Sequence, residues 1–204
     1  MDALTKWLEI VLCLPVWLSG MVLCVGAAVE KEVAHMNRER FKEEKMRAPF
    51  QILAIPYTIM DGSLHYCLFH RADSDQWQFI AGGGEDDETP VEAAKREILE
   101  ESGATADNLI ELKSICYIPA DIFPKRHLYH WTADTYVVPE YSFAFDCKEE
   151  INLSHEHTAY VWLTFEGARS KLKWDSNKTA LYELNCRLEA ELGAEQEFPE
   201  ALGI

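Results

Sequence analysis

Basic residues are scarce in this chain of 204 residues. Nineteen Lys and Arg stand against 35 Asp and Glu, which gives a net charge of −16 at pH 7. The first 48 residues hold seven of each sign, so the whole acidic excess lies in residues 49–204. Such a body repels a phosphate backbone, which excludes a sequence-tolerant binder of DNA or RNA. An acidic surface suits a protein that recruits divalent cations, although it also serves solubility.

Paired cysteine motifs are also absent. The six cysteines form no CxxC pair, and no histidine lies at zinc-finger spacing from them. A zinc site or a disulfide framework is therefore not indicated, and the pattern fits a reducing compartment. Internal repeats and low-complexity tracts are missing too. With 48% hydrophobic and 26% charged residues, the composition is that of a globular domain.

The N-terminal segment is the one long uncharged run. Residues 10–29 carry no charge over a length that can span a bilayer, and basic residues follow them. A single-pass anchor would place the remaining chain in the cytoplasm by the positive-inside rule. A secretory signal and a true start at Met36 or Met46 are the alternatives. Residues 30–47, of mixed charge, are predicted to be a solvated helix or linker, so residues 1–48 form a leader and 49–204 the domain.

The domain alternates strand and helix patterns, which predicts an α/β or α+β sandwich. Asp61-Gly62 is a strong turn signal between two arms of a hairpin. Thr89 is a predicted N-cap, with Glu92 completing a capping box and Gly103 ending the helix. Its buried stripe is expected to be Val91, Ala94 and Ile98. Further strands are predicted over residues 50–59, 63–71, 77–80, 109–117, 135–138, 142–146 and 158–163, and helices over 165–172 and 175–192, the last with Ala180, Leu181, Leu184 and Leu188 inward.

Three glutamates share one face of the predicted helix. Glu97, Glu100 and Glu101 are spaced i, i+3 and i+4, which places their carboxylates within one arc. Like charges at this spacing repel each other, and a bound hard cation such as Mg²⁺ would offset the repulsion. The preceding glycines permit a tight turn and a close approach of the backbone. Arg96 is expected to tie Glu88 to the helix.

The stretch from Gly82 to Ala104 resembles the Nudix box, G-x5-E-x7-R-E-U-x-E-E-x-G-U, where U is a bulky apolar residue. The final U is the small Ala104, and every other fixed position agrees: Gly82, Glu88, Arg96, Glu97, Ile98, Glu100, Glu101 and Gly103. WQFIAGGGE, EHTAYVWL and WDSNKTAL extend the similarity, over about residues 48–190, to bacterial dihydroneopterin triphosphate pyrophosphatases, which also hydrolyse dATP. The resemblance implies an α/β/α sandwich with a mixed central sheet.

The resemblance also implies a site and a reaction. Glu97, Glu100 and Glu101 would bind Mg²⁺, for which Mn²⁺ can substitute, together with the carbonyl of Ala81. Glu156 would complete the metal shell or act as the general base. The reaction would be attack of water at the α-phosphorus of a nucleoside or pterin triphosphate, which releases a monophosphate and pyrophosphate. Similar enzymes are often homodimers.

Candidate substrate contacts follow from residue chemistry. Arg71 and Arg126 are candidates for phosphate binding. Trp77 is a candidate for stacking on a pterin or purine ring, with Phe123, Tyr129 and Trp131 as further aromatic candidates. Gln78 and Asn177 are possible polar selectors. His127 and His130 are not expected to bind metal, because hard Mg²⁺ prefers oxygen ligands.

Two other functions remain open on the same fold. A non-catalytic ligand sensor would be expected to lose box carboxylates, and none is missing here. An enzyme like isopentenyl diphosphate isomerase would need a cysteine nucleophile, for which Cys67 and Cys116 are the candidates.

Overall fold

The computed structural model describes residues 46–123 and 125–197. The predicted anchor at residues 10–29 and most of the charged linker lie outside these residues. In the described part, no helix has the length and apolar character to cross a membrane.

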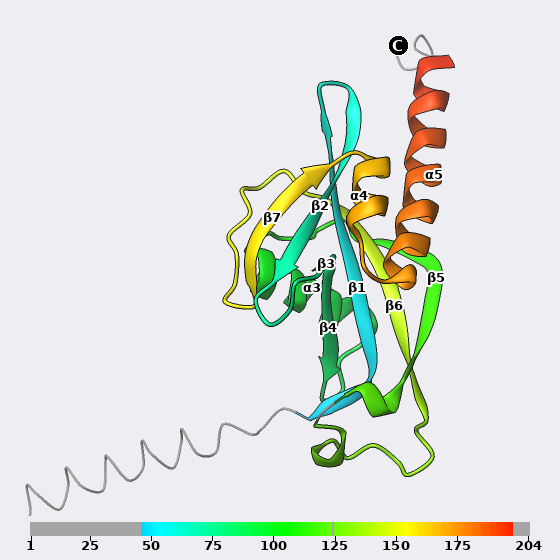
Figure 1. Ribbon diagram of the computed structural model, residues 1–204. Coiled ribbons are helices and arrows are strands. Elements are labelled where there is room, and N and C mark those ends of the chain that lie inside the picture. The colour runs from blue at the N-terminus through cyan, green and yellow to red at the C-terminus, as the bar shows by residue number, and fades with distance from the viewer. Residues whose placement is uncertain (1–45, 124, 198–204) are drawn as a thin grey trace, which may run out of the picture. The chain divides into compact units, whose positions relative to one another are not determined.

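A mixed seven-stranded sheet forms the centre of the domain (Figure 1). Its long strand β1 (Arg47–Met60) pairs in antiparallel fashion with β2 (Ser63–Arg71) and β4 (Ile80–Glu85), and in parallel with β6 (Val137–Asp146). The strand β5 (Ile110–Pro119) pairs with β6, while β3 (Trp77–Gln78) and β7 (His157–Leu163) pair with β2. This mixed α+β arrangement confirms the predicted fold class.

The hairpin between β1 and β2 has the predicted two-residue turn. Asp61 and Gly62 have φ angles of 49° and 77°, and Met60 pairs directly with Ser63. Positive φ at both central residues gives a turn whose twist matches that of the flanking strands.

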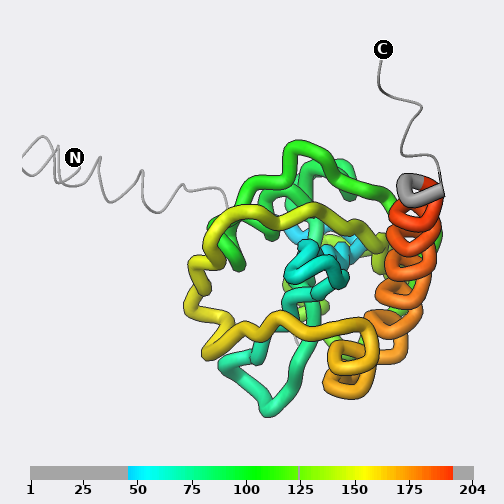
Figure 2. Tube along the Cα trace, turned by 90° about the horizontal axis from the view of Figure 1, so that it is seen from above, coloured from blue at the N-terminus to red at the C-terminus, as the bar shows by residue number. Residues whose placement is uncertain are grey.

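Helices cover both faces of the sheet. The helix α3 (Pro90–Ser102) packs its buried residues on one face, against Ile52, Phe69 and Phe143. The helices α4 (Phe165–Lys171) and α5 (Asp175–Glu197) lie side by side on the other face, as Figures 1 and 2 show. The residues Ala180, Leu181, Leu184 and Leu188 of α5 are buried there, as predicted. Each fully buried leucine of this set stabilises the fold by about 1.5–3 kcal/mol.

The capping of α3 follows the sequence closely. The Thr89 hydroxyl accepts from the Glu92 N–H, and the Glu92 carboxylate accepts from the Thr89 N–H at 2.8 Å. Gly103 ends the helix at φ 70°. The predicted buried stripe is wrong at Val91, which is 40% exposed, whereas Ala93 is fully buried. The face of α3 that packs on the sheet therefore includes Ala93 and Ala94 and leaves Val91 outside it.

The two strands predicted between residues 135 and 146 form a single strand in the structure. This strand, β6 (Val137–Asp146), joins residues 137–138 to 142–146 through Pro139, while Thr135 and Tyr136 lie outside it. Proline lacks an N–H and is tolerated where one side of a strand is free. Pro139 pairs with Tyr117 of β5, and pairing with β1 starts only at Glu140. The short 3-10 turns Ala120–Ile122 and Arg126–Leu128 connect β5 to β6.

The linker prediction is wrong at its C-terminal end. Arg47 and Ala48 belong to β1, and Arg47 pairs with Glu85 of β4. The charge of Arg47 favours a solvated helix in isolation, but the ladder with β4 extends the strand to this residue.

Candidate active site

A cavity of about 760 Å³ lies at one end of the sheet, beside α3 and the start of α5. Ligand pockets commonly have volumes of about 300–1,000 Å³. The charged residues in its wall include Arg47, Arg71, Glu97, Glu101 and Glu156. Glu140, Cys116, Phe123, Trp174 and Asn177 contribute elsewhere in the wall. The wall thus combines acidic and basic groups with apolar and aromatic ones.

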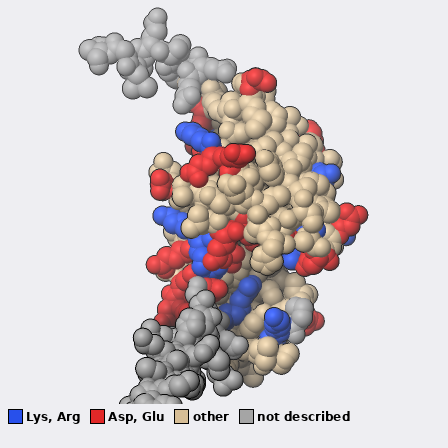
Figure 3. Space-filling view, turned by 90° about the vertical axis from the view of Figure 1, so that its left-hand side faces the viewer, with Lys and Arg blue, Asp and Glu red and all other residues tan. Residues whose placement is uncertain are grey.

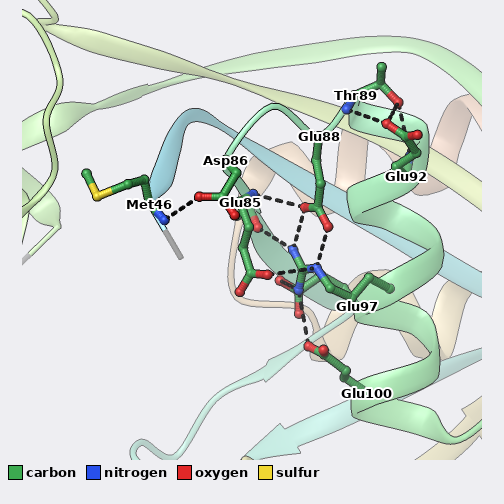
Figure 4. A network of polar contacts seen from close by, with 10 residues as sticks. Met46, Glu85, Asp86, Glu88, Thr89, Glu92, Glu97 and Glu100 are labelled. Carbon is green, nitrogen blue, oxygen red and sulfur yellow. Dashed lines mark hydrogen bonds and ion pairs between the residues drawn. The ribbon is translucent and has the colours of Figure 1, made fainter. Parts of the chain in front are cut away.

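Arg96 is the centre of the polar network along α3. Its Nε donates to Glu88 at 2.8 Å, its Nη2 donates to the Gly83 carbonyl at 2.8 Å, and its Nη1 lies 2.9 Å from Glu97 and 3.1 Å from Glu100. Figure 4 shows the carboxylates of Glu88, Glu97 and Glu100 directed toward this one guanidinium. Burial lowers the pKa of Arg96, but these carboxylates more than compensate and raise it. The network therefore holds the loop before α3 against the helix.

Glu101 is the most buried of the three box glutamates, with 4% of its surface exposed. Its Oε2 has no hydrogen-bond partner among the described residues. Burial, together with the charges of Glu97 and Glu156, raises the pKa of Glu101 to about 9, while Arg71 and the Ala81 N–H oppose this. A buried carboxylate oxygen without a partner is costly, and it is the kind of group that a bound cation compensates.

Gly82 makes room for Glu97. A Cβ at position 82 would lie 1.9 Å from the Glu97 carboxylate. The three glycines belong to β4, and none of them has a positive φ. The expected tight turn is therefore wrong, whereas the expected close approach of backbone and side chain is present.

Glu156 faces the same cavity from the loop before β7. It is exposed, and its charge acts on both Glu101 and Arg71. The next residue, His157, is buried against Phe69, with Nε2 3.6 Å from Glu101 Oε2. Burial, with the charge of Arg71, lowers the pKa of His157. The sequence pattern did not single out His157, although it directly follows Glu156.

The donor chemistry of this region fits a hard divalent cation. Glu97, Glu101, Glu156 and the backbone of Ala81 border one cavity, and carboxylate and carbonyl oxygens are the ligands such cations prefer. Among residues 46–123 and 125–197, however, no three acidic, His or Cys side chains already form a metal-binding cluster. Glu97 and Glu100 are instead paired with Arg96, and Glu100 does not border the cavity.

Two guanidinium groups, those of Arg71 and Arg47, border the same cavity as the glutamates. Arg71 forms a bidentate pair with Asp73 at 2.6 Å. Arg47 lies over the Phe123 ring at 5.5 Å and donates to Gln51 at 2.6 Å. A Cβ at Gly83 would lie 1.7 Å from the Arg47 Cζ, so the glycine gives this guanidinium its place. Arg47 was not predicted as a site residue because its charged neighbours assign it to the linker.

The other predicted contacts separate into two groups. Gln78 and Asn177 border the cavity, and Asn177 accepts a hydrogen bond from the Phe79 N–H at 3.1 Å. Trp77 does not border it and packs against His70 and Lys171. Arg126 does not border it either, and its Nη2 donates to the Thr135 carbonyl at 2.8 Å. Of the aromatic candidates, Phe123 reaches the wall, while Tyr129 and Trp131 pack beside it.

Acidic side chains cluster on one side of the domain. Figure 3 views the domain from the side on which β7 lies in Figure 1, and Asp and Glu side chains gather there with a few basic groups among them. Divalent cations would be attracted to such a surface.

Comparisons with known proteins identify the family to which this fold and this cavity belong. The NUDIX domain model matches residues 53–184. Dihydroneopterin triphosphate diphosphatase of Escherichia coli K12 is 29% identical over 143 residues, which cover 69% of this chain and 94% of the relative.

Solved structures give the same result. A Nudix hydrolase structure from Listeria monocytogenes is 44% identical with a TM-score of 0.62, and the match covers 71% of this chain and 97% of that one. The E. coli dihydroneopterin triphosphate pyrophosphohydrolase is 28% identical with a TM-score of 0.54, covering 70% and 99%. With Glu97 and Glu101 of the box helix at the cavity, these matches show that the chain belongs to the Nudix family, as a hydrolase of diphosphate bonds.

Proposed function

We propose that this Nudix hydrolase is an Mg²⁺-dependent pyrophosphohydrolase that cleaves a nucleoside or pterin triphosphate to a monophosphate and pyrophosphate. The candidate substrates are dATP-like nucleotides and dihydroneopterin triphosphate, the compound in the name of the E. coli relative. The observation that carries the proposal is the cavity wall itself. It combines the carboxylates of Glu97, Glu101 and Glu156 with the guanidinium groups of Arg47 and Arg71.

Glu97, Glu100 and Glu101 would hold the cation, with the Ala81 carbonyl as a further ligand. When bound, Mg²⁺ neutralises phosphate oxygens and lowers the pKa of a coordinated water. Glu100 would leave Arg96 to join the site, and its exposed side chain leaves it free to turn. Arg96 would retain Glu88 and the Gly83 carbonyl, and so keep α3 in position.

Arg47 and Arg71 would bind the phosphate chain, because guanidinium groups pair well with phosphate oxygens. Glu156 would accept the proton of the attacking water, since it is exposed and faces the buried carboxylates. The water oxygen forms a bond to the α-phosphorus, and the bond from that phosphorus to the bridging oxygen breaks. Pyrophosphate leaves. Trp77 and Arg126 have no role in this scheme.

The test is hydrolysis by the purified full-length chain with Mg²⁺ and a panel of triphosphates. We expect pyrophosphate and a monophosphate as products, and release of orthophosphate with a diphosphate would contradict attack at the α-phosphorus. Glu101→Gln should lower kcat by orders of magnitude. The control is Glu150→Gln, which makes the same change at an exposed glutamate away from the cavity.

The same assay separates the two alternatives. A sensor would bind triphosphates without turnover. An isomerase would need a reactive thiol, but Cys67 is fully buried. Cys116 borders the cavity, and burial and the nearby Glu140 raise its pKa. Neither thiol is therefore activated as a nucleophile.

The cellular location is part of the proposal and follows from the sequence. The catalytic domain would be cytoplasmic, and residues 10–29 would provide its only attachment to a membrane. Fractionation of cells that express a C-terminally tagged chain tests this. A soluble product beginning near Met46 would exclude the anchor.

A further inference from the structure

Glu140 is a buried carboxyl at the cavity that the proposed phosphate chemistry does not use. It lies on β6, only 5% of its surface is exposed, and it borders the cavity. Its Oε1 has no hydrogen-bond partner among the described residues. Burial raises its pKa, and the Ser176 hydroxyl opposes this only in part. Most buried polar groups in proteins are hydrogen-bonded, so an unpaired carboxylate oxygen at a cavity points to a missing partner.

The sheet register separates Glu140 from the Nudix box. Gly83 of β4, Gln51 of β1, Glu140 of β6 and Cys116 of β5 are successive partners across four strands. Neighbouring strands lie about 4.8 Å apart, so the backbone of Glu140 lies roughly 10 Å from that of Gly83, next to the box. A substrate whose phosphates meet Arg47 and the cation proposed at Glu97 would have Glu140 within reach of its ring, on the other side of β1 from the box.

The surrounding wall suits a flat ring. Ile118, Ile122, Phe123 and Trp174 border the cavity together with Glu140. Aromatic and apolar side chains of this kind hold a heteroaromatic ring, and a few polar groups then select its edge. Gln51 already accepts a hydrogen bond from Arg47, and Asn177 already accepts one from Phe79. Glu140 keeps Oε1 without a partner among the described residues, and its other oxygen, which meets the Ser176 hydroxyl, retains a second lone pair for a ligand.

We propose that Glu140 determines base specificity by accepting hydrogen bonds from the two adjacent N–H groups of a 2-amino-4-oxopyrimidine edge, the edge that guanine and pterins share. An ionised carboxylate only accepts hydrogen bonds, through two oxygens that match this pair of donors. Adenine offers one donor beside an acceptor, and thymine offers one donor between two acceptors. This inference rests on the proposed triphosphate chemistry and names the substrate class within it.

The experiment measures kcat/KM of the full-length chain for dGTP, dITP, dATP and dihydroneopterin triphosphate. dITP is the matched probe, because it lacks only the 2-amino group of guanine. For the wild-type chain we expect dGTP and the pterin to exceed dATP and dITP by about tenfold or more, since a missing partner leaves a buried acceptor unsatisfied. A preference for dATP, or equal rates for dGTP and dITP, would overturn the inference without any variant.

Glu140→Gln supplies the second arm. An amide presents one donor and one acceptor, which suits adenine, so the ratio of dGTP to dATP should fall about tenfold or more. The difference between dGTP and dITP should shrink in the same variant. Hydrolysis of a base-free ribose triphosphate reports on the chemistry alone and should not change. Glu111→Gln, an exposed carboxylate on β5, should leave every ratio as in the wild type.

The outcomes distinguish this inference from the proposed function. If the wild-type chain hydrolyses triphosphates but both ratios survive Glu140→Gln, Glu140 has a structural role only. If no triphosphate is hydrolysed, the proposed reaction fails, and calorimetric affinities for dGTP and dITP still decide the role of Glu140. Tighter binding of dGTP than of dITP supports the inference. Equal affinities, or tighter binding of dITP, reject it.

Discussion

The Glu97 carboxylate occupies the space that any side chain at position 82 would need, with 1.9 Å between its Cδ and a Cβ at Gly82. Gly82→Ala must therefore displace Glu97 or move β4 away from α3. We expect the free energy of unfolding to fall by about 1–3 kcal/mol, as overpacking usually costs, and hydrolysis to fall with it.

Chemical denaturation and the hydrolysis assay together test this change. The control is Gly193→Ala in α5, where a Cβ meets no atom within 4 Å. That substitution should raise stability by about 0.5–1 kcal/mol, because alanine is the better helix former. Wild-type stability for Gly82→Ala would refute the close packing of β4 on α3.

Arg96 gives the second prediction. Its planar fork contacts Glu88, Glu97, Glu100 and the Gly83 carbonyl at once, and a lysine ammonium cannot reproduce that geometry. Arg96→Lys should leave the carboxylates poorly placed and raise the Mg²⁺ concentration needed for half-maximal rate. The measurement is a magnesium titration of the hydrolysis rate. Lys95→Arg, a neighbouring exposed cation, is the control.

Removal of divalent cations should abolish hydrolysis, and Mg²⁺ or Mn²⁺ should restore it. Stability should change too. A cation that binds only the folded state stabilises it by mass action, and it offsets the repulsion that Glu97 and Glu156 exert on Glu101. The melting temperature should rise with Mg²⁺ in the wild type and much less in Glu101→Gln. An equal rise in both would remove Glu101 from the site.

The Glu183 carboxylate joins α5 to β5, because it accepts hydrogen bonds from the backbone of Lys113 and Ser114. We expect this contact to make the stability of the fold depend on pH. Burial favours a higher pKa for Glu183, but hydrogen bonds from Ser114 and Lys113 and the charge of Arg187 outweigh burial and lower it. A pKa that is lower in the folded state gives stability above the unfolded pKa, and this stability is lost as the pH falls through the folded value.

Glu183→Gln should thus cost about 1–3 kcal/mol at pH 7, and much less once the pH is well below the ordinary carboxyl range. Urea denaturation of wild type and variant, at pH 7 and at a pH well below the ordinary carboxyl range, checks the difference. A cost that does not depend on pH would mean that packing, and not charge, holds this contact.

Local interactions explain what the sequence by itself determined. Thr89, Glu92 and Gly103 delimit α3 because the capping contacts join residues only a few positions apart. Asp61 and Gly62 define the hairpin for the same reason. The spacing of Glu97, Glu100 and Glu101 is likewise local to one helix. The Nudix box can therefore be identified from the sequence without any tertiary contact.

Contacts between segments far apart in the sequence decided the burial of α3, the course of β6 and the cavity residues outside the box. Val91 fits the helical stripe but is exposed, and the continuity of β6 through Pro139 depends on which neighbour pairs at that point. Arg47 and Glu140 reach the cavity because β1, β4 and β6 align them across the sheet, although they lie far from the box in the chain. A single sequence records neither strand register nor burial, so the groups that face the substrate beyond the box emerged only from the tertiary structure.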